Sequence, residues 1–132
     1  MKHFLGIEDE EFIRGKVPMT KKEIRILTLA GAKIGKNDIV CDIGAGTGSL
    51  SIEAALLAKA GHVYAVERKK EAVELIRQNA AKFGIENITI IESEAPAGLE
   101  QLPERLDAAI IGGTGSHLEE ILEFLDKRLK PG

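Results

Sequence analysis

The chain has 132 residues, which is enough for one domain with one hydrophobic core. Its hydrophobic content of 44% and charged content of 30% are ordinary for a globular protein, and its net charge of −3 argues against a nucleic-acid binder, which normally has a basic face. A single cysteine excludes a disulfide framework, and because the sequence has neither a secretory signal nor an apolar run of membrane length, we expect a cytoplasmic protein without a membrane partner.

The single domain is predicted to consist of an irregular N-terminal segment, residues 1–19, and a regular core, residues 20–132. One helical turn is expected in the first segment, over Asp9–Arg14, because Gly15 stops it. The rest of that segment has no helical or strand periodicity, so its role must come from its side chains.

A capping box predicts where the core begins. Thr20 and Glu23 stand three positions apart, so the Thr20 hydroxyl is expected to cap a helix that runs to about Ala32. Its apolar residues Ile24 and Leu27 are predicted to face the core.

Four apolar runs then alternate with helical patterns. Strands are predicted over Ile39–Ile43, His62–Glu67, Ile88–Ile91 and Ala108–Ile111, and helices over Ser49–Lys59, Lys70–Phe83, Ala97–Leu102 (one short turn) and Ser116–Leu129. Gly61 is expected to end the first of these helices as a C′ glycine, and Gly84 stands just after the second. The alternation predicts an α/β, Rossmann-like parallel sheet with strand order 3-2-1-4 and helices on both faces.

The stretch Ile39–Glu53 reads IVCDIGAGTGSLSIE, in which an apolar strand breaks into three glycines and continues as a helix. Glycine permits positive φ and close approach to a ligand, and the helix N-terminus that follows favours an acidic group. The run departs from the dinucleotide fingerprint, because Ser49 stands where the third glycine should be. A phosphate-binding loop is also excluded, since no Gly-Lys-Ser/Thr follows.

Glu67 ends the second predicted strand, 21 residues after Gly46, close to the spacing of about 20 for an acid that holds a ribose diol. The D-x-G-x-G-x-G run Asp42–Gly48 with this acid resembles motifs I and II of the Rossmann-like methyltransferases that use S-adenosylmethionine (SAM). In such a site Glu67 accepts from both ribose hydroxyls, and Asp42 orients the turn amides or, through water, the ammonium. The cofactor residues expected are Asp42, Gly44, Ala45, Gly46, Thr47, Gly48 and Glu67. The alternative is a glycine turn without a ligand and a surface glutamate.

The N-terminal segment carries a narrower resemblance. Gly6–Lys21 resembles the opening of the decarboxylating precorrin methyltransferases of cobalamin biosynthesis, and Ser93–Pro96 and Ile111–Gly113 continue the match. Members of that family methylate carbon 15 of the corrinoid ring, with or without cobalt, and remove carbon dioxide from the ring-C acetate. The resemblance implies SAM as cofactor, a tetrapyrrole as substrate, and contacts of Thr20 and Ala95 with SAM.

A precorrin bears many carboxylates, and basic side chains gather near the start of the first predicted helix. They are Arg14, Lys16, Lys21, Lys22 and Arg25. Arginine pairs bidentately with carboxylates, so we interpret the cluster as a substrate collar and assign Arg14, Lys16 and Lys21 to substrate binding. The alternative for each side chain is a solvated charged turn.

The methyltransferase family normally continues past the Lys-Pro-Gly at 130–132 into strands 5–7, whereas this sequence stops where strand 5 should begin. The last predicted strand would then be an apolar edge. We therefore predict a truncated domain, or one completed by a partner in a homo-oligomer.

Other candidates are fewer. Cys41 is expected to be a small buried hydrophobe, and no Cys/His spacing indicates a metal site. His117 is a proton relay or, alternatively, a surface histidine, and the sequence identifies no catalytic acid or base. Two other functions stay open: a SAM-dependent methyltransferase acting on RNA or protein, and a non-catalytic SAM-binding or assembly module.

Overall fold

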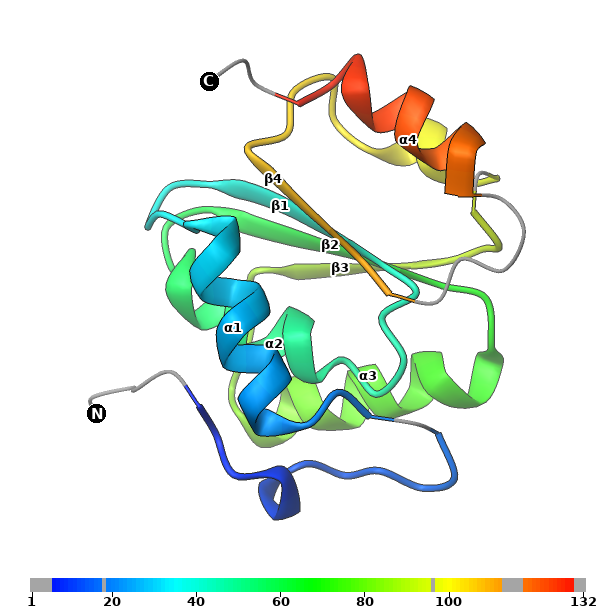
Figure 1. Ribbon diagram of the computed structural model, residues 1–132. Coiled ribbons are helices and arrows are strands. Elements are labelled where there is room, and N and C mark those ends of the chain that lie inside the picture. Colours follow the sequence, from blue (N-terminus) through cyan, green and yellow to red (C-terminus); the bar gives the residue numbers. More distant parts are fainter. Residues whose placement is uncertain (1–5, 18, 96, 113–117, 130–132) are drawn as a thin grey trace.

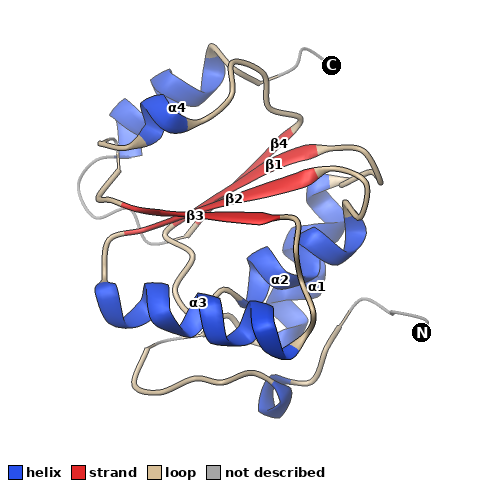
Figure 2. Ribbon diagram, turned by 180° about the vertical axis from the view of Figure 1, so that it is seen from behind, coloured by secondary structure: helices blue, strands red, loops and turns tan. Residues whose placement is uncertain are grey.

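The computed structural model describes residues 6–17, 19–95, 97–112 and 118–129. Its centre is a parallel sheet in the order β3-β2-β1-β4, with β1 at Ile39–Ile43, β2 at His62–Glu67, β3 at Ile88–Glu92 and β4 at Ala108–Ile111. One face is covered by α1 (Lys22–Ala32), α2 (Ser49–Leu57) and α3 (Lys70–Lys82), and the other by α4 (Leu118–Asp126), as Figures 1 and 2 show. The predicted Rossmann-like architecture and strand order are confirmed.

Both faces of the sheet are buried because successive strand residues point to opposite sides. In β1, Val40 packs in the cluster that contains Leu29 of α1, whereas Cys41 and Ile43 pack in the cluster that contains Ile121 of α4. Cys41 is fully buried, as predicted. Three strand predictions match the observed bounds, the helices are a few residues shorter than predicted, and single 3-10 turns occupy Asp9–Glu11 and Leu99–Gln101.

Two glycines end helices in different ways. Gly84 has φ +67°, and its amide and that of Ile85 donate to carbonyls in the last turn of α3, so Gly84 is a C′ glycine. The C′ prediction for Gly61 is wrong, since its φ lies outside the left-handed region. Gly61 is required by space: a Cβ there would lie 2.0 Å from the carbonyl oxygen of Asp38.

The capping prediction for α1 is wrong. The first helical hydrogen bond runs from the Arg25 amide to the Lys21 carbonyl, so Lys21 is the N-cap residue and Thr20 lies before the helix. The helix begins without a side-chain cap.

The predicted inner face of α1 is also wrong. Ile24 and Leu27 are 56% and 69% exposed, whereas Arg25 and Leu29 are the buried residues. The helix is turned in this way because the Arg25 guanidinium meets a carboxylate from α2, Glu53, which local periodicity does not reveal.

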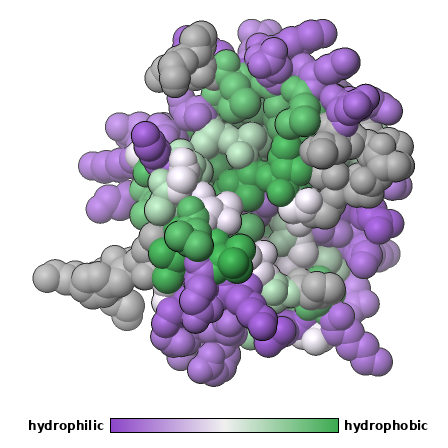
Figure 3. Space-filling model, viewed as in Figure 1, coloured by the Kyte–Doolittle hydropathy of each residue, from purple (hydrophilic) through white to green (hydrophobic). Residues whose placement is uncertain are grey.

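The edge of the sheet at β4 is apolar. β4 pairs with β1, and no other strand in the described part of the chain pairs with it. Figure 3 shows apolar side chains gathering over β4 and between α4 and α1. A groove here is lined by Ala109, Ile111, Leu122, Glu123, Leu125, Asp126 and Leu129. None of the described helices is long and apolar enough to cross a membrane.

Candidate functional site

The glycine turn that follows β1 depends on positive φ. Gly44, Gly46 and Gly48 have φ values of 75°, 60° and 86°, which other L-residues rarely adopt. The Gly44 amide donates to the Val66 carbonyl at 2.8 Å, which fixes the turn to the end of β2. Gly48 is the N-cap residue of α2, and a Cβ there would lie 3.0 Å from the Ile76 side chain of α3.

The Glu67 carboxylate lies against this turn. Its Oε1 accepts from the Gly46 amide at 3.0 Å, and its Oε2 accepts from the Lys69 amide at 2.8 Å. Glu67 is 6% exposed, so these two bonds fix a nearly buried carboxylate at the carboxyl end of β2. Each oxygen has two lone pairs, and so each can accept a second hydrogen bond.

Asp42 lies below the turn and is buried. Its Oδ2 accepts from the Ser51 hydroxyl at 2.6 Å, and its Oδ1 has no hydrogen-bond partner among the residues that the structure describes. Burial raises the pKa of Asp42 from 3.8 to about 6, the Ser51 hydrogen bond lowers it, and the nearby Glu67 charge raises it. The site therefore contains a buried carboxyl group that titrates just below neutral pH.

A pocket of about 380 Å³ opens beside the turn, where parallel sheets of this kind bind ligands. It is lined by Val17, Met19, Thr20, Gly44, Ala45, Gly46, Glu67, Arg68, Lys69 and Gly112. Gly112 follows β4, and a Cβ there would lie 2.8 Å from the Gly44 carbonyl oxygen, so only glycine lets these two walls meet. Of the residues predicted to bind cofactor, the pocket brings together Thr20, Gly44, Ala45, Gly46 and Glu67.

Four other predicted cofactor residues do not line this pocket. Asp42 and Thr47 are buried under the turn, and the Thr47 hydroxyl has no hydrogen-bond partner within the described ranges. Gly48 starts α2, and Ala95 packs in the apolar cluster beneath α4. These residues can shape the turn and its surroundings without lining the pocket.

Only some of the basic residues in the predicted substrate collar are exposed. Arg25 is fully buried, so the prediction that it faces a substrate is wrong. Lys22 pairs with Glu8 at 2.6 Å. Arg14, Lys16 and Lys21 are exposed but do not line the pocket.

Two cations at the pocket were missed from the sequence. Arg68 and Lys69 are exposed and line it, directly after Glu67. Only their position in the sequence could have indicated them, because residues that directly follow a strand-end acid lie at the same edge of the sheet. His117 and Gly113–Gly115 lie outside the described residues. The described side chains contain no group of three or more His, Cys, Asp or Glu that could hold a metal ion.

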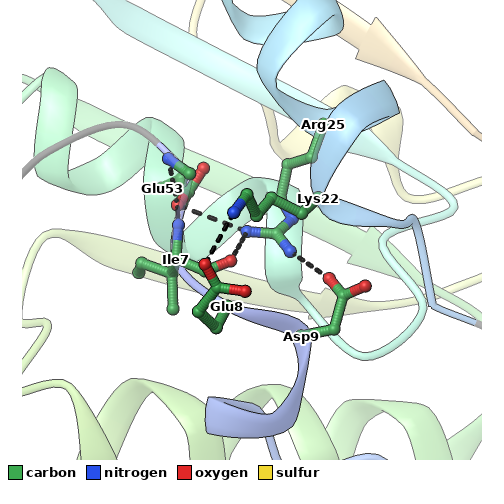
Figure 4. A network of polar contacts seen from close by, with 7 residues as sticks. Ile7, Glu8, Asp9, Lys22, Arg25 and Glu53 are labelled. Atoms are coloured by element: carbon green, nitrogen blue, oxygen red, sulfur yellow. Dashed lines mark hydrogen bonds and ion pairs between the residues drawn. The ribbon is translucent and has the colours of Figure 1, made fainter.

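The segment before α1, which we call the N-terminal strap (residues 6–17, 19 and 20), is held by a buried ion pair. Arg25 Nη1 lies 3.3 Å from Glu53 Oε1, and both side chains are fully buried. Figure 4 shows this pair together with Ile7, Glu8, Asp9 and Lys22. Arg25 also donates to the Ile7 carbonyl at 2.9 Å and to Asp9 Oδ1 at 2.6 Å. Glu53 Oε1 accepts from the amides of Gly6 and Ile7. The strap then runs past α3 (Figure 1). Its residues Val17, Met19 and Thr20 line the pocket.

A parallel sheet in this strand order, with a glycine turn after β1 and a strand-end carboxylate bound to that turn, has the Rossmann-like fold of the class I methyltransferases. A family model described as precorrin methyltransferase domain matches residues 11–132. The chain belongs to the precorrin methyltransferase family.

Individual relatives agree. The chain is 50% identical over 129 residues to a "Probable cobalt-precorrin-6B C(15)-methyltransferase (decarboxylating)" of Sulfolobus acidocaldarius, covering 96% of this chain and 67% of that one. It matches the crystal structure of precorrin-6y C5,15-methyltransferase from Geobacter metallireducens with a TM-score of 0.90 and 43% identity, covering 96% of this chain and 66% of that one. The chain thus spans about two thirds of the length of these relatives.

Proposed function

We propose that the chain forms the cofactor-binding part of a SAM-dependent methyltransferase that methylates carbon 15 of a precorrin or cobalt-precorrin and removes carbon dioxide from its ring-C acetate. The observation that carries the proposal is the nearly buried Glu67 carboxylate, hydrogen-bonded to the glycine turn at the edge of an open pocket. The names of the relatives supply the reaction.

The residues at the pocket fit this cofactor. Glu67 retains acceptor capacity for a ribose diol, and the flat wall at Gly44–Gly46 admits the methionine part of the ligand. Asp42, ionised above a pKa of about 6, favours a cationic ammonium near the turn. Thr20, which lines the pocket from the strap, carries a hydroxyl that suits a polar part of the ligand.

A tetrapyrrole with many carboxylates suits the cations around the site. Arg68 and Lys69 border the pocket itself, and we propose that Arg14, Lys16 and Lys21 bind more distant carboxylates. We further propose that residues 1–19 border the substrate and that residues 20–132 bind the cofactor. The open β4 edge suits completion of the unit by further polypeptide.

When bound, SAM supplies a methyl group on a sulfonium that is already reactive. This chain's part is then to hold the cofactor and the ring carbon in line and to exclude water. Loss of carbon dioxide breaks the bond between the arm carbon and the carboxylate and leaves an electron pair that the conjugated ring accepts. The arm carbon then takes up a proton to become a methyl group, and the pocket residues identify no dedicated donor for that proton.

Calorimetry with S-adenosylhomocysteine (SAH) tests the cofactor, and methyl transfer from labelled SAM to cobalt-precorrin-6B, to tRNA and to peptides tests the substrate. We expect SAH binding by this chain, and methylation of the corrinoid alone by the completed unit. Absence of SAH binding would refute the proposal. Turnover of RNA or peptide with an inert corrinoid would favour one alternative, and SAH binding without any turnover by the completed unit would favour a non-catalytic module.

A further inference from the structure

The Asn79 side chain on α3 joins two segments that are far apart in the sequence. It is fully buried. Its Oδ1 accepts from the Ile13 amide at 2.7 Å, and its Nδ2 donates to the Ile13 carbonyl at 2.9 Å and to the Thr47 carbonyl at 3.0 Å. One amide group therefore pairs both backbone groups of a strap residue and one carbonyl of the glycine turn.

These two segments both supply walls of the pocket. Thr47 lies inside the turn whose Gly44–Gly46 part lines the pocket, and Ile13 precedes the strap residues Val17, Met19 and Thr20, which also line it. Ile76, one turn before Asn79 on the same helix, packs under Gly48. The relative position of the two walls is thus fixed from α3, through a side chain that does not itself line the pocket.

The bonds are difficult to replace. A buried backbone amide or carbonyl left without a partner is strongly unfavourable, and a change at Asn79 would leave three such groups unpaired. The strap or the turn would have to shift to let water reach them. Either movement changes the width of the pocket before it unfolds the sheet, because neither segment belongs to the sheet.

We propose that Asn79 is a positioning residue for the cofactor: it holds the strap and the glycine turn at the separation that the ligand requires. The inference rests on the proposed function. A residue of α3 that does not line the pocket would then control the affinity for SAM.

Asn87 provides a matched control. Its Nδ2 also donates to two backbone carbonyls, those of Ala55 at 3.0 Å and Ala58 at 2.9 Å, but it ties α2 to the loop before β3, at the opposite end of the strands. Asn79→Asp and Asn87→Asp are isosteric and remove the same two donors. We expect both to lower the melting temperature, and only Asn79→Asp to weaken SAH binding, by about tenfold or more, since each lost hydrogen bond of this kind is worth up to about one decade.

The measurement is calorimetric titration with SAH at a temperature where circular dichroism shows each variant folded. Equal affinity of wild type and Asn79→Asp, with only the melting temperature lowered, would overturn the inference and leave the proposed function standing. Failure of the wild type to bind SAH would remove the proposed function and the inference together.

Hydrogen exchange in the wild type keeps the inference testable if Asn79→Asp does not fold. The Ile13 amide is bonded to Asn79, and the Gly35 amide is bonded to an Asp38 oxygen at the opposite end of the strands. Saturating SAH should slow exchange at Ile13 by about tenfold or more while Gly35 is unchanged, because a filled pocket holds the strap closed. Unchanged exchange at Ile13 in the presence of bound SAH would overturn the inference.

Discussion

Glu67 has two tasks at one carboxylate. Its hydrogen bonds to the amides of Gly46 and Lys69 shape the turn, and its remaining lone pairs are those that we assign to the ribose. Replacing it therefore removes ligand contacts and loosens one wall of the pocket. This dual role separates it from an ordinary glutamate at the end of a strand.

We predict that Glu67→Ala weakens SAH binding by about 3 kcal/mol or more, since two charge-assisted bonds of roughly 1.5–3 kcal/mol each are lost. Glu67→Gln, which keeps one acceptor oxygen, should lose about half as much. Titration calorimetry measures both, with Glu86→Gln, an exposed acid at the opposite end of the strands, as control. An unchanged affinity in Glu67→Ala would make Glu67 a purely structural residue.

Asp42 makes stability depend on pH. Its pKa is raised by burial to about 6 in the folded chain, above about 3.9 in the unfolded chain. The native state therefore binds the Asp42 proton more tightly than the unfolded state does. The contribution of this proton to the free energy of unfolding is complete below pH 4 and is lost as the pH rises through 6. Two pKa units correspond to about 3 kcal/mol.

We accordingly predict that wild type loses up to about 3 kcal/mol of unfolding free energy relative to Asp42→Asn between pH 4 and pH 7. Urea unfolding of both proteins at several pH values gives this difference, and the other carboxylates cancel because both proteins contain them. A difference that does not change with pH would mean that Asp42 ionises in the fold as easily as in water.

At the scale of secondary structure, strands were easier to predict than the first helix. The runs of β1, β2 and β4 are apolar because both of their faces are buried, so each strand could be predicted from its own residues. In α1 one of the two buried residues is Arg25, whose partners Glu53 and Asp9 come from α2 and from the strap. A charge that is buried by distant partners cannot be recognised from the periodicity of its own helix.

The ion pair of Arg25 and Glu53 should dominate the stability of the strap. Arg25→Met leaves the Glu53 carboxylate buried without its cation, and we predict a loss of about 3–5 kcal/mol in unfolding free energy. Lys22→Met, which breaks the exposed pair with Glu8 on the same helix, should cost less than about 1 kcal/mol. Urea unfolding compares the two, and similar losses would show that burial of the pair does not matter.

For the whole molecule, the parallel sheet could be predicted because strands alternate with helices, and the position of a pocket beside the glycine turn because glycines and an acid mark strand ends. The course of the strap could not, since it depends on buried contacts of Asn79, Arg25 and Glu53 with backbone groups far away in the sequence. Gly112 was missed for a similar reason. Position 112 requires glycine because the carbonyl oxygen of Gly44, a residue far away in the sequence, lies too close for a Cβ.

The apolar surface beside β4 should govern association of this 132-residue chain. Leu27 and Leu122 are 69% and 49% exposed on α1 and α4, on either side of the β4 edge, with which no strand pairs other than β1 among the described residues. Contiguous apolar surface of this kind drives association in water, and an open edge offers unpaired backbone groups to a second copy. We predict concentration-dependent self-association at micromolar concentrations, measurable by sedimentation velocity.

Leu27→Lys with Leu122→Lys should shift that equilibrium toward monomer by about tenfold or more, because charges would have to be buried in the contact. Ile13→Lys is the matched control, since Ile13 is 37% exposed but lies on the strap, away from β4. If the control dissociates the protein as well as the double variant does, the strap forms the contact instead. If wild type is monomeric at all concentrations, the exposed edge is protected by its own twist and shortness.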